Sequence, residues 1–180
     1  VYSLDKYEIE GSADAVAQKY GYGSPLHLAA LQLFPKAGAM ATFPVYILPV
    51  AKGAQWTKAQ GEILITGDAA TKAGSGTVSV GGVDAEFSVA KGATASETMA
   101  AIVAAINAVL EMPAAAAVTA ASGDVPEHIT LTAKWSGALG NSITIVMDAD
   151  LPGLTVAITA FADGAGTPDV TSALEKIGQK

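Results

Sequence analysis

The sequence predicts an α+β fold: a β-sandwich or partly open β-barrel module with one packed helix, inserted in an incomplete α/β layer. Two observations support the module. Between residues 59 and 162 a series of short stretches alternates apolar and polar residues, as half-buried strands do, and one helical pattern interrupts them. A third observation supports the α/β layer, because residues 13–50 show helical patterns followed by a continuous apolar run.

The clearest of these patterns is a hairpin over residues 76–89. Valines alternate with polar residues on both sides of Gly81-Gly82, and a Gly-Gly loop suits a tight turn with positive φ at both positions. This loop places Val80 opposite Val83, so that one face of the hairpin is apolar and the register is well specified.

A helix over residues 95–110 follows the hairpin. Thr94 and Glu97 have the spacing of a capping box, and Pro113 prevents the helix from continuing. Apolar residues then fall on one stripe, namely Met99, Ile102, Val103, Ile106, Val109 and Leu110. The helix and the apolar face of the hairpin are expected to cover each other.

The remaining strands of the module are shorter. Alternation predicts strands at residues 62–66, 118–120, 128–134, 142–147 and 154–160, with a glycine-containing loop at 135–141. Strands with this two-residue period need one face toward solvent.

Two helices and one strand are predicted before the module. Ser12 caps a helix that ends at Tyr20, and Ser24-Pro25 starts a second helix that reaches Phe34. A loop at residues 36–42 leads to the apolar run from Pro44 to Val50, which is typical of a strand covered on both faces.

These patterns divide the chain into three parts. Residues 1–58 form the incomplete α/β part with two helices and one buried strand, residues 59–162 form the inserted β-rich module with helix 95–110, and residues 163–180 return the chain to the α/β part. Segments 51–60 and 161–168 act as paired linkers. Because elements are already under way at both ends, we expect the chain to be a piece of a longer polypeptide.

The composition narrows the function classes. Of the 180 residues, 51% are hydrophobic and 15% are charged, so the chain is not disordered by composition. The net charge of −7 argues against nucleic acid as a partner. The absence of cysteine excludes disulfides and thiol catalysis, and no apolar run is long enough for insertion in a membrane.

The two histidines lack the partners that catalysis or metal binding requires. His27 has no second histidine nearby and is interpreted as a capping or partly buried residue rather than a ligand. His128 adjoins Glu127, but neighbouring residues in a strand point to opposite faces. We therefore expect His128 to lie at the surface.

Other candidates are weaker still. Asp124, Asp148, Asp150 and Asp163 could touch a cation, but the ligand ladder of a calcium loop is absent, and solvated turn carboxylates are the better interpretation. The glycine pairs Gly21/Gly23 and Gly74/Gly76 lack the setting of a dinucleotide site, and Ser24 and Ser122 lack that of a nucleophile elbow. The sequence therefore predicts no catalytic, cofactor-binding or metal-binding residues, no cofactor, and no enzyme.

The order of several motifs along the chain resembles the order found in the tail sheath proteins of Mu-like contractile-tailed bacteriophages. The motifs are GYGSPLHLAALQLF and FPVYILPV near the front, GTVSVGG with the Thr94-x-x-Glu97 helix, LTAKWSGALGNSITI, and AFADGAGTPDVTSALEKIG near the end. The resemblance extends over nearly the whole chain.

The resemblance implies a structural and mechanical role. Such subunits polymerise around a tail tube, and their lattice contracts to drive the tube through the host envelope during genome ejection. It implies a helical homo-oligomer of sheath subunits, with the tail tube and baseplate as further partners. It also implies a place in the virion of a phage or prophage, after assembly in the host cytoplasm. The piece by itself is expected to be monomeric.

A cell-surface adhesion or glycan-binding β-module is the alternative. Its Thr/Ser-rich strands and two tryptophans, Trp56 and Trp135, would form a carbohydrate platform. Tryptophans more often seal the junction between a loop and a core.

Overall fold

The computed structural model describes residues 7–34, 45–50 and 52–177, and it has the α+β fold that the sequence predicts. In chain order the elements are β1 (Glu8–Glu10), α1 (Ala13–Tyr20), α2 (Pro25–Leu33), β2 (Val45–Ile47), β3 (Gln60–Thr66), β4 (Gly74–Val80), β5 (Val83–Val89), α3 (Ala95–Ala108), β6 (Ala114–Thr119), β7 (His128–Ala133), the short 3₁₀ helix η1 (Ala138–Ser142), β8 (Ile145–Asp150), β9 (Thr155–Ala162) and α4 (Val170–Ile177).

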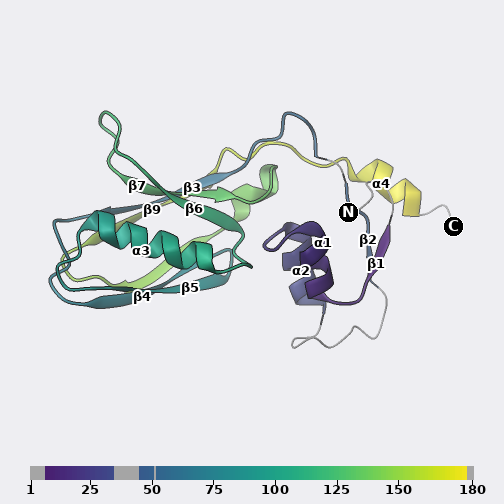
Figure 1. Ribbon diagram of the computed structural model, residues 1–180. Coiled ribbons are helices and arrows are strands. Elements are labelled where there is room, and N and C mark those ends of the chain that lie inside the picture. Colours follow the sequence, from purple (N-terminus) through teal and green to yellow (C-terminus); the bar gives the residue numbers. More distant parts are fainter. Residues whose placement is uncertain (1–6, 35–44, 51, 178–180) are drawn as a thin grey trace.

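Two antiparallel sheets and one helix build the module, by which we mean residues 59–162 (Figure 1). One sheet has the order β6-β7-β3-β9 and the other β5-β4-β8. Strands β8 and β9 lie side by side, while α3 packs against β5 and β6 at the other open side. Neither sheet closes into a barrel, so the helix completes a sandwich whose core lies between the three elements.

The predicted hairpin is confirmed in its turn and register. Gly81 and Gly82 have φ values of 59° and 81°, which is the combination that a two-residue turn between right-twisted strands requires. Val80 pairs with Val83, and the valines of the inner face are buried beneath α3. The alternation of side chains therefore sets which face of β4 and β5 meets the core.

Helix α3 starts where the capping box predicts and ends earlier than expected. The Thr94 hydroxyl accepts a hydrogen bond from the Glu97 amide, and the Glu97 carboxylate accepts one from the Thr94 amide at 2.8 Å. Met99, Ile102 and Ile106 are buried. The predicted end at residue 110 is wrong, since α3 stops at Ala108 and the Leu110 side chain is 66% exposed.

Two predicted strands start three or more residues away from the observed strands. Strand β6 begins at Ala114 rather than Val118, because the Asn107 side chain bonds both the amide and the carbonyl of Ala116 and so fixes this alanine run beside α3. Strand β8 begins at Ile145 rather than Ser142, because η1 occupies the preceding residues.

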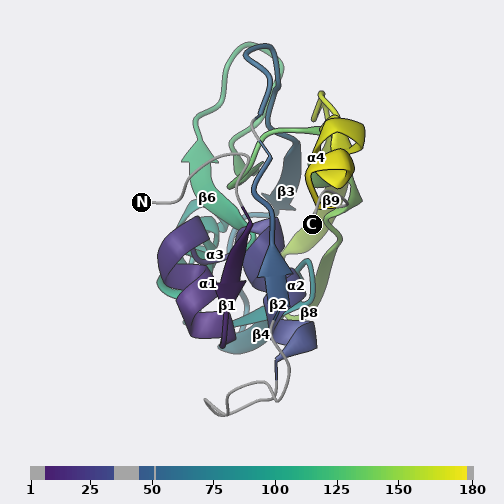
Figure 2. The same ribbon diagram turned by 90° about the vertical axis from the view of Figure 1, so that its right-hand side faces the viewer.

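A small lobe, defined here as residues 7–34 and 45–50, forms a separate core. Helices α1 and α2 lie beside the two-stranded antiparallel ribbon β1-β2 (Figure 2), and its core contains Val16, Ala30, Phe34 and Ile47. The prediction of a strand buried on both faces is wrong, because β2 spans only Val45–Ile47 and Tyr46 is exposed. Pro44 and the predicted loop at residues 36–42 lie outside the described residues.

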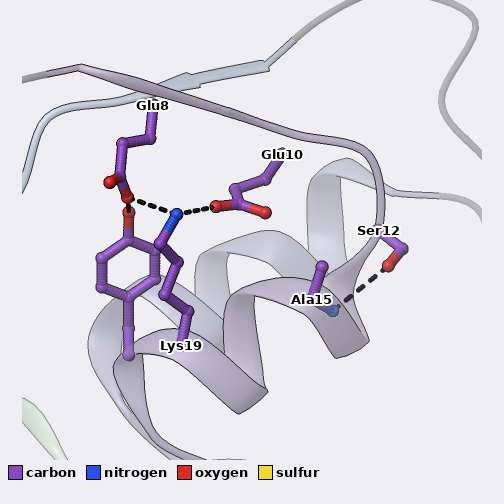
Figure 3. Close-up of polar contacts among 6 residues, drawn as sticks. Glu8, Glu10, Ser12, Ala15 and Lys19 are labelled. Atoms are coloured by element: carbon purple, nitrogen blue, oxygen red, sulfur yellow. Dashed lines mark hydrogen bonds and ion pairs between the residues drawn. The ribbon is translucent and has the colours of Figure 1, made fainter. Parts of the chain in front are cut away.

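Strand β1 is held to α1 by a lysine between two carboxylates (Figure 3). Lys19 Nζ lies 2.9 Å from a carboxylate oxygen of Glu10 and also pairs with Glu8, which accepts a 2.7 Å hydrogen bond from the Tyr20 hydroxyl. The hydrogen bonds to Glu8 and Glu10 raise the pKa of Lys19. This clamp fixes the ribbon on the helices, and no pattern in the sequence predicts β1.

Candidate functional site

The largest hollow that we identify lies between the small lobe and the module. This inter-lobe cleft has a volume of about 830 Å³, which is within the range of small-molecule sites. Apolar side chains from both sides line it, and both tryptophans of the chain contribute. The apolar and aromatic lining residues are Tyr20, Pro25, Leu26, Leu48, Pro49, Val50, Trp56, Trp135, Ala138, Leu139 and Pro168.

The turn between α1 and α2 sets the position of the small lobe against the module. In this GYG turn, residues 21–23, Gly23 has a φ of 74°, and a Cβ added there would lie 2.3 Å from the Met112 carbonyl oxygen. Lys134 of the module donates to the Leu110 carbonyl at 2.9 Å and to the Tyr22 carbonyl at 3.4 Å. Only a glycine allows this approach, so the GYG turn is where the two parts meet.

His27 stabilises the GYG turn from inside the small lobe. The side chain is fully buried, and its Nδ1 accepts a 3.0 Å hydrogen bond from the Gly23 amide. Burial lowers the pKa of His27, while Glu111 and Asp14 act in the opposite direction. Nδ1 can accept this hydrogen bond only when it carries no proton, and the lowered pKa favours the same neutral imidazole. His27 is therefore a buried structural histidine, which is closer to the predicted capping or partly buried residue than to a ligand.

The tryptophans seal the floor of the cleft. Trp56 packs so closely on glycine backbones that a Cβ added at Gly166 would lie 2.3 Å from its ring, and one at Gly53 would lie 2.4 Å away. Trp135 packs against the module core, and its Nε1 has no hydrogen-bond partner within the described ranges. Glycine backbones of the chain itself therefore lie close against the Trp56 ring, which favours the sealing role over a carbohydrate platform.

The two chain segments that connect the lobes run antiparallel and are bonded to each other. Thr57 and Ala165 form a bridge, and the Thr57 hydroxyl donates to the Asp163 carbonyl at 2.6 Å. Asn141, within η1, bonds both the amide and the carbonyl of Gly164, at 2.8 and 3.0 Å. This short helix therefore acts as a clamp on the returning segment.

Lysines supply the positive charge of the cleft. Lys52, Lys58 and Lys134 line it, in a chain whose net charge is −7. Partial burial lowers the pKa of Lys134. No motif in the sequence signals this cluster, because its members come from a linker and from the end of β7.

The remaining candidates lie elsewhere and do not converge. His128 is buried rather than at the surface, because Nδ1 contacts the Pro126 carbonyl at 2.9 Å and Nε2 faces Glu62 of β3 at 3.9 Å. Asp148 and Asp150 are exposed on strand β8, not in a turn.

The serines and glycines have local roles. Ser24 caps α2 by accepting from the His27 amide, and Ser122 bridges to Val125. Gly74 and Gly76 lie within β4, while Asp124 and Asp163 are exposed. Within the part of the chain that the structure describes, no three acidic or histidine side chains cluster as metal ligands would. The helices of that part are too short or too polar to cross a membrane.

Comparisons with known proteins give little similarity. No family model matches the chain, and no curated protein matches it. Among solved structures, it is similar to the D2-D3 domains of the flagellar cap protein FliD from Escherichia coli, with 16% identity, 62% of this chain and 72% of that chain covered, and a TM-score of 0.31. Two crystal forms of the same domains from Serratia marcescens show 12% and 11% identity over 67% of this chain, covering 82% and 96% of theirs, with TM-scores of 0.27.

Proposed function

We propose that this chain is part of a tail sheath subunit of a Mu-like contractile-tailed bacteriophage, a structural protein that acts without enzymatic chemistry. The subunit polymerises around a tail tube, contacts other sheath subunits and the baseplate, and contracts to drive the tube through the host envelope. It assembles in the host cytoplasm and resides in the virion.

The observation that carries this proposal is the paired crossing between the lobes. Segments 52–59 and 163–168 leave and re-enter the module side by side, joined at Thr57 and Ala165. Two of the sheath-like motifs contribute contacts at this junction: Gly23 of the GYG turn lies against the Met112 carbonyl, and Asn141 bonds Gly164. This supports a module inserted in a larger body and held to it firmly.

A rigid insertion suits a lattice that rearranges. Contraction requires that each subunit stay folded while its contacts with neighbours change. The module has a continuous core between its two sheets and α3. Its two linkers form hydrogen bonds with each other at Thr57 and Ala165. The energy released on contraction then comes from interfaces between subunits and not from unfolding of the module.

The glycan-binding alternative has one observation in its favour, since both tryptophans line the same cleft. A sugar needs an open ring face on which to stack, and glycine backbones lie close against the Trp56 ring. We therefore rank this function second.

Two measurements separate the functions. Tryptophan emission is recorded while neutral and acidic oligosaccharides are added to the chain, and the protein of natural length that contains it is followed by sedimentation velocity as its concentration rises. The sheath proposal predicts no saturable change of emission and large assemblies at high concentration. A saturable sugar response together with a single small species at every concentration would contradict it.

A further inference from the structure

Strand β9 is an outer strand of its sheet with an unprotected edge. Its sequence, TVAITAFA, contains no charged residue and no proline, and such residues are what usually keep an exposed edge from pairing with another chain. Within residues 7–34, 45–50 and 52–177, no backbone hydrogen bond joins the outer edge of β9 to another segment. This edge therefore presents amides and carbonyls that a further strand can bond.

The other three outer strands of the two sheets are protected. The Asn107 side chain of α3 bonds the amide and the carbonyl of Ala116 in β6, and α3 also packs against β5. Strand β8 carries Asp148 and Asp150, and it lies beside β9 without bonding to it. Both β8 and β9 lie on the opposite side of the module from α3 (Figure 2), so the helix leaves β9 uncovered.

The central part of β9 is complementary to itself. Residues 155–159 read Thr-Val-Ala-Ile-Thr, so the types of side chain follow the same order in both directions. When a second β9 is placed antiparallel with Ala157 opposite Ala157, each Thr155 faces a Thr159 and each Val156 faces an Ile158. Threonine pairs form hydrogen bonds across strands, and the Val–Ile pairs bury apolar surface.

Pairing in this register also covers an exposed part of the core row. Val156 and Ile158 lie opposite Ile65 and Ile63 of β3, and both of these isoleucines are buried. Ile158 faces the same side of the sheet but is 41% exposed, because no strand lies beyond β9. A second β9 would add its own Val156 and Ile158 to this row.

The two ends of β9 limit the length of the pairing. Gly153, with a φ of 91°, lies in the turn before the strand. After Thr159 the register with β3 shifts by one residue before Ala162, and such a bulge disrupts a regular ladder. Regular pairing is therefore confined to residues 155–159, which is the self-complementary stretch.

We infer that β9 pairs antiparallel with β9 of a second copy, so that two four-stranded sheets join across a two-fold axis at Ala157. A two-fold contact uses the same patch of both copies and closes at a dimer. The inference therefore goes beyond the sheath proposal and does not rest on it, because a polymer needs other contacts. The paired stretch buries little area, so the chain is monomeric when dilute and dimeric when concentrated.

Charges placed at the two-fold axis test this pairing. Ala157→Lys and Ala157→Glu each put like charges directly opposite one another, whereas an equimolar mixture puts Lys opposite Glu. Ala157 is exposed, so both variants should fold, which circular dichroism checks. Ala117→Lys is the matched control, since Ala117 is an exposed alanine on β6, at the other edge of the same sheet.

Sedimentation velocity of the 180-residue chain from micromolar to millimolar concentration measures the association. We expect the wild-type chain and A117K to dimerise equally, and A157K and A157E to dimerise about tenfold more weakly or less. Their mixture should dimerise at least as strongly as wild type. A wild-type chain that stays monomeric at millimolar concentration, or a mixture that associates no better than either variant alone, would overturn the inference.

Cysteine cross-linking tests the register. The chain has no cysteine, so a single introduced cysteine can form a disulfide only between two copies. Directly opposite residues of an antiparallel pair have Cα atoms about 4.5 to 5.5 Å apart, a distance that a disulfide spans. With oxidised glutathione as the oxidant, A157C should therefore form a covalent dimer, and A117C should not.

The two threonines make this test specific. Thr155→Cys and Thr159→Cys should each fail to cross-link alone and should cross-link when mixed, because residue 155 of one copy faces residue 159 of the other. Cross-linking of T155C alone as fast as A157C would overturn the inference. The sheath proposal is read separately from polymers of the natural-length protein, so either proposal can fail while the other stands.

Discussion

The backbone amide of Gly23 lies 3.0 Å from Nδ1 of His27, and this hydrogen bond fixes the shape of the GYG turn that contacts the module. On the other side of the same glycine, the Met112 carbonyl leaves no room for a side chain. The joint between the two lobes therefore depends on one positive-φ glycine, one neutral histidine and the backbone of the α3–β6 connection.

Replacing Gly23 by alanine should loosen this joint. The substitution strains a residue whose φ is 74° and drives a Cβ toward the Met112 oxygen, and we expect a loss of about 2 kcal/mol or more. Gly82→Ala is the matched control, because its φ of 81° is close to that of Gly23 but nothing lies within 4 Å of an added Cβ. We expect about 1 kcal/mol for the control. Urea unfolding measures both, and equal losses would show that the close approach contributes nothing.

Acidification should weaken the small lobe through His27. Because its folded pKa is lowered, chiefly by burial, the unfolded chain takes up the proton first. The stability that neutral His27 contributes is therefore fully present above the unfolded pKa of about 6.5 and is lost as the pH falls toward the folded pKa. The total loss is about 1.4 kcal/mol for each pH unit that separates the folded from the unfolded pKa.

His27→Asn isolates this effect, because the Asn oxygen can accept the Gly23 hydrogen bond and does not titrate. Hydrogen exchange of α1 and α2 at pH 8 and pH 5 should show faster exchange at pH 5, after correction for the intrinsic rate, in wild type and not in the variant. The same pH dependence in both proteins would remove His27 as its cause.

Loss of the Asn141 clamp should free the returning segment. Asn141→Ala removes both hydrogen bonds to Gly164, and we expect a loss of about 1–2 kcal/mol and faster proteolysis within residues 163–168. Asn141→Asp keeps the acceptor for the Gly164 amide and should give an intermediate effect. First cleavage inside the hairpin and helix of residues 76–107 would contradict the division of the chain at its linkers.

The capping box of α3 gives a prediction in acid. Thr94→Ala should cost about 1 kcal/mol. Hydrogen bonds from the Thr94 amide and hydroxyl lower the pKa of Glu97, so its contribution is present above about pH 4.3 and is lost as the pH falls through the lowered folded value. Urea titrations of wild type and Glu97→Gln across this range should converge as the pH falls. A constant difference between them would argue against the carboxylate as the cap.

Local patterns predicted the module best where each element depends on its own residues. Gly81-Gly82 defines a turn and Thr94 with Glu97 defines a helix start, and the structure has both. The end of α3 and the start of β6 were wrong because a tertiary contact, Asn107 with Ala116, decides them. Such contacts leave no periodic signal.

The junction was harder to predict because its parts are far apart in the chain. Strand β1 has three residues, too few for a pattern, and its carboxylates acquire a role only beside Lys19. Lys134 contacts Tyr22 across more than a hundred residues of sequence. The sequence predicts His128 at the surface because the neighbouring Glu127 points to the opposite face of a strand, whereas in the structure Glu62 of the adjacent strand faces His128.

Electron microscopy of the natural-length protein that contains this chain, at high concentration and over a range of salt and pH, tests the sheath proposal most directly. The proposal predicts hollow tubes or stacked rings in which each subunit is folded. A single monodisperse particle under every condition, with no polymer, would contradict it.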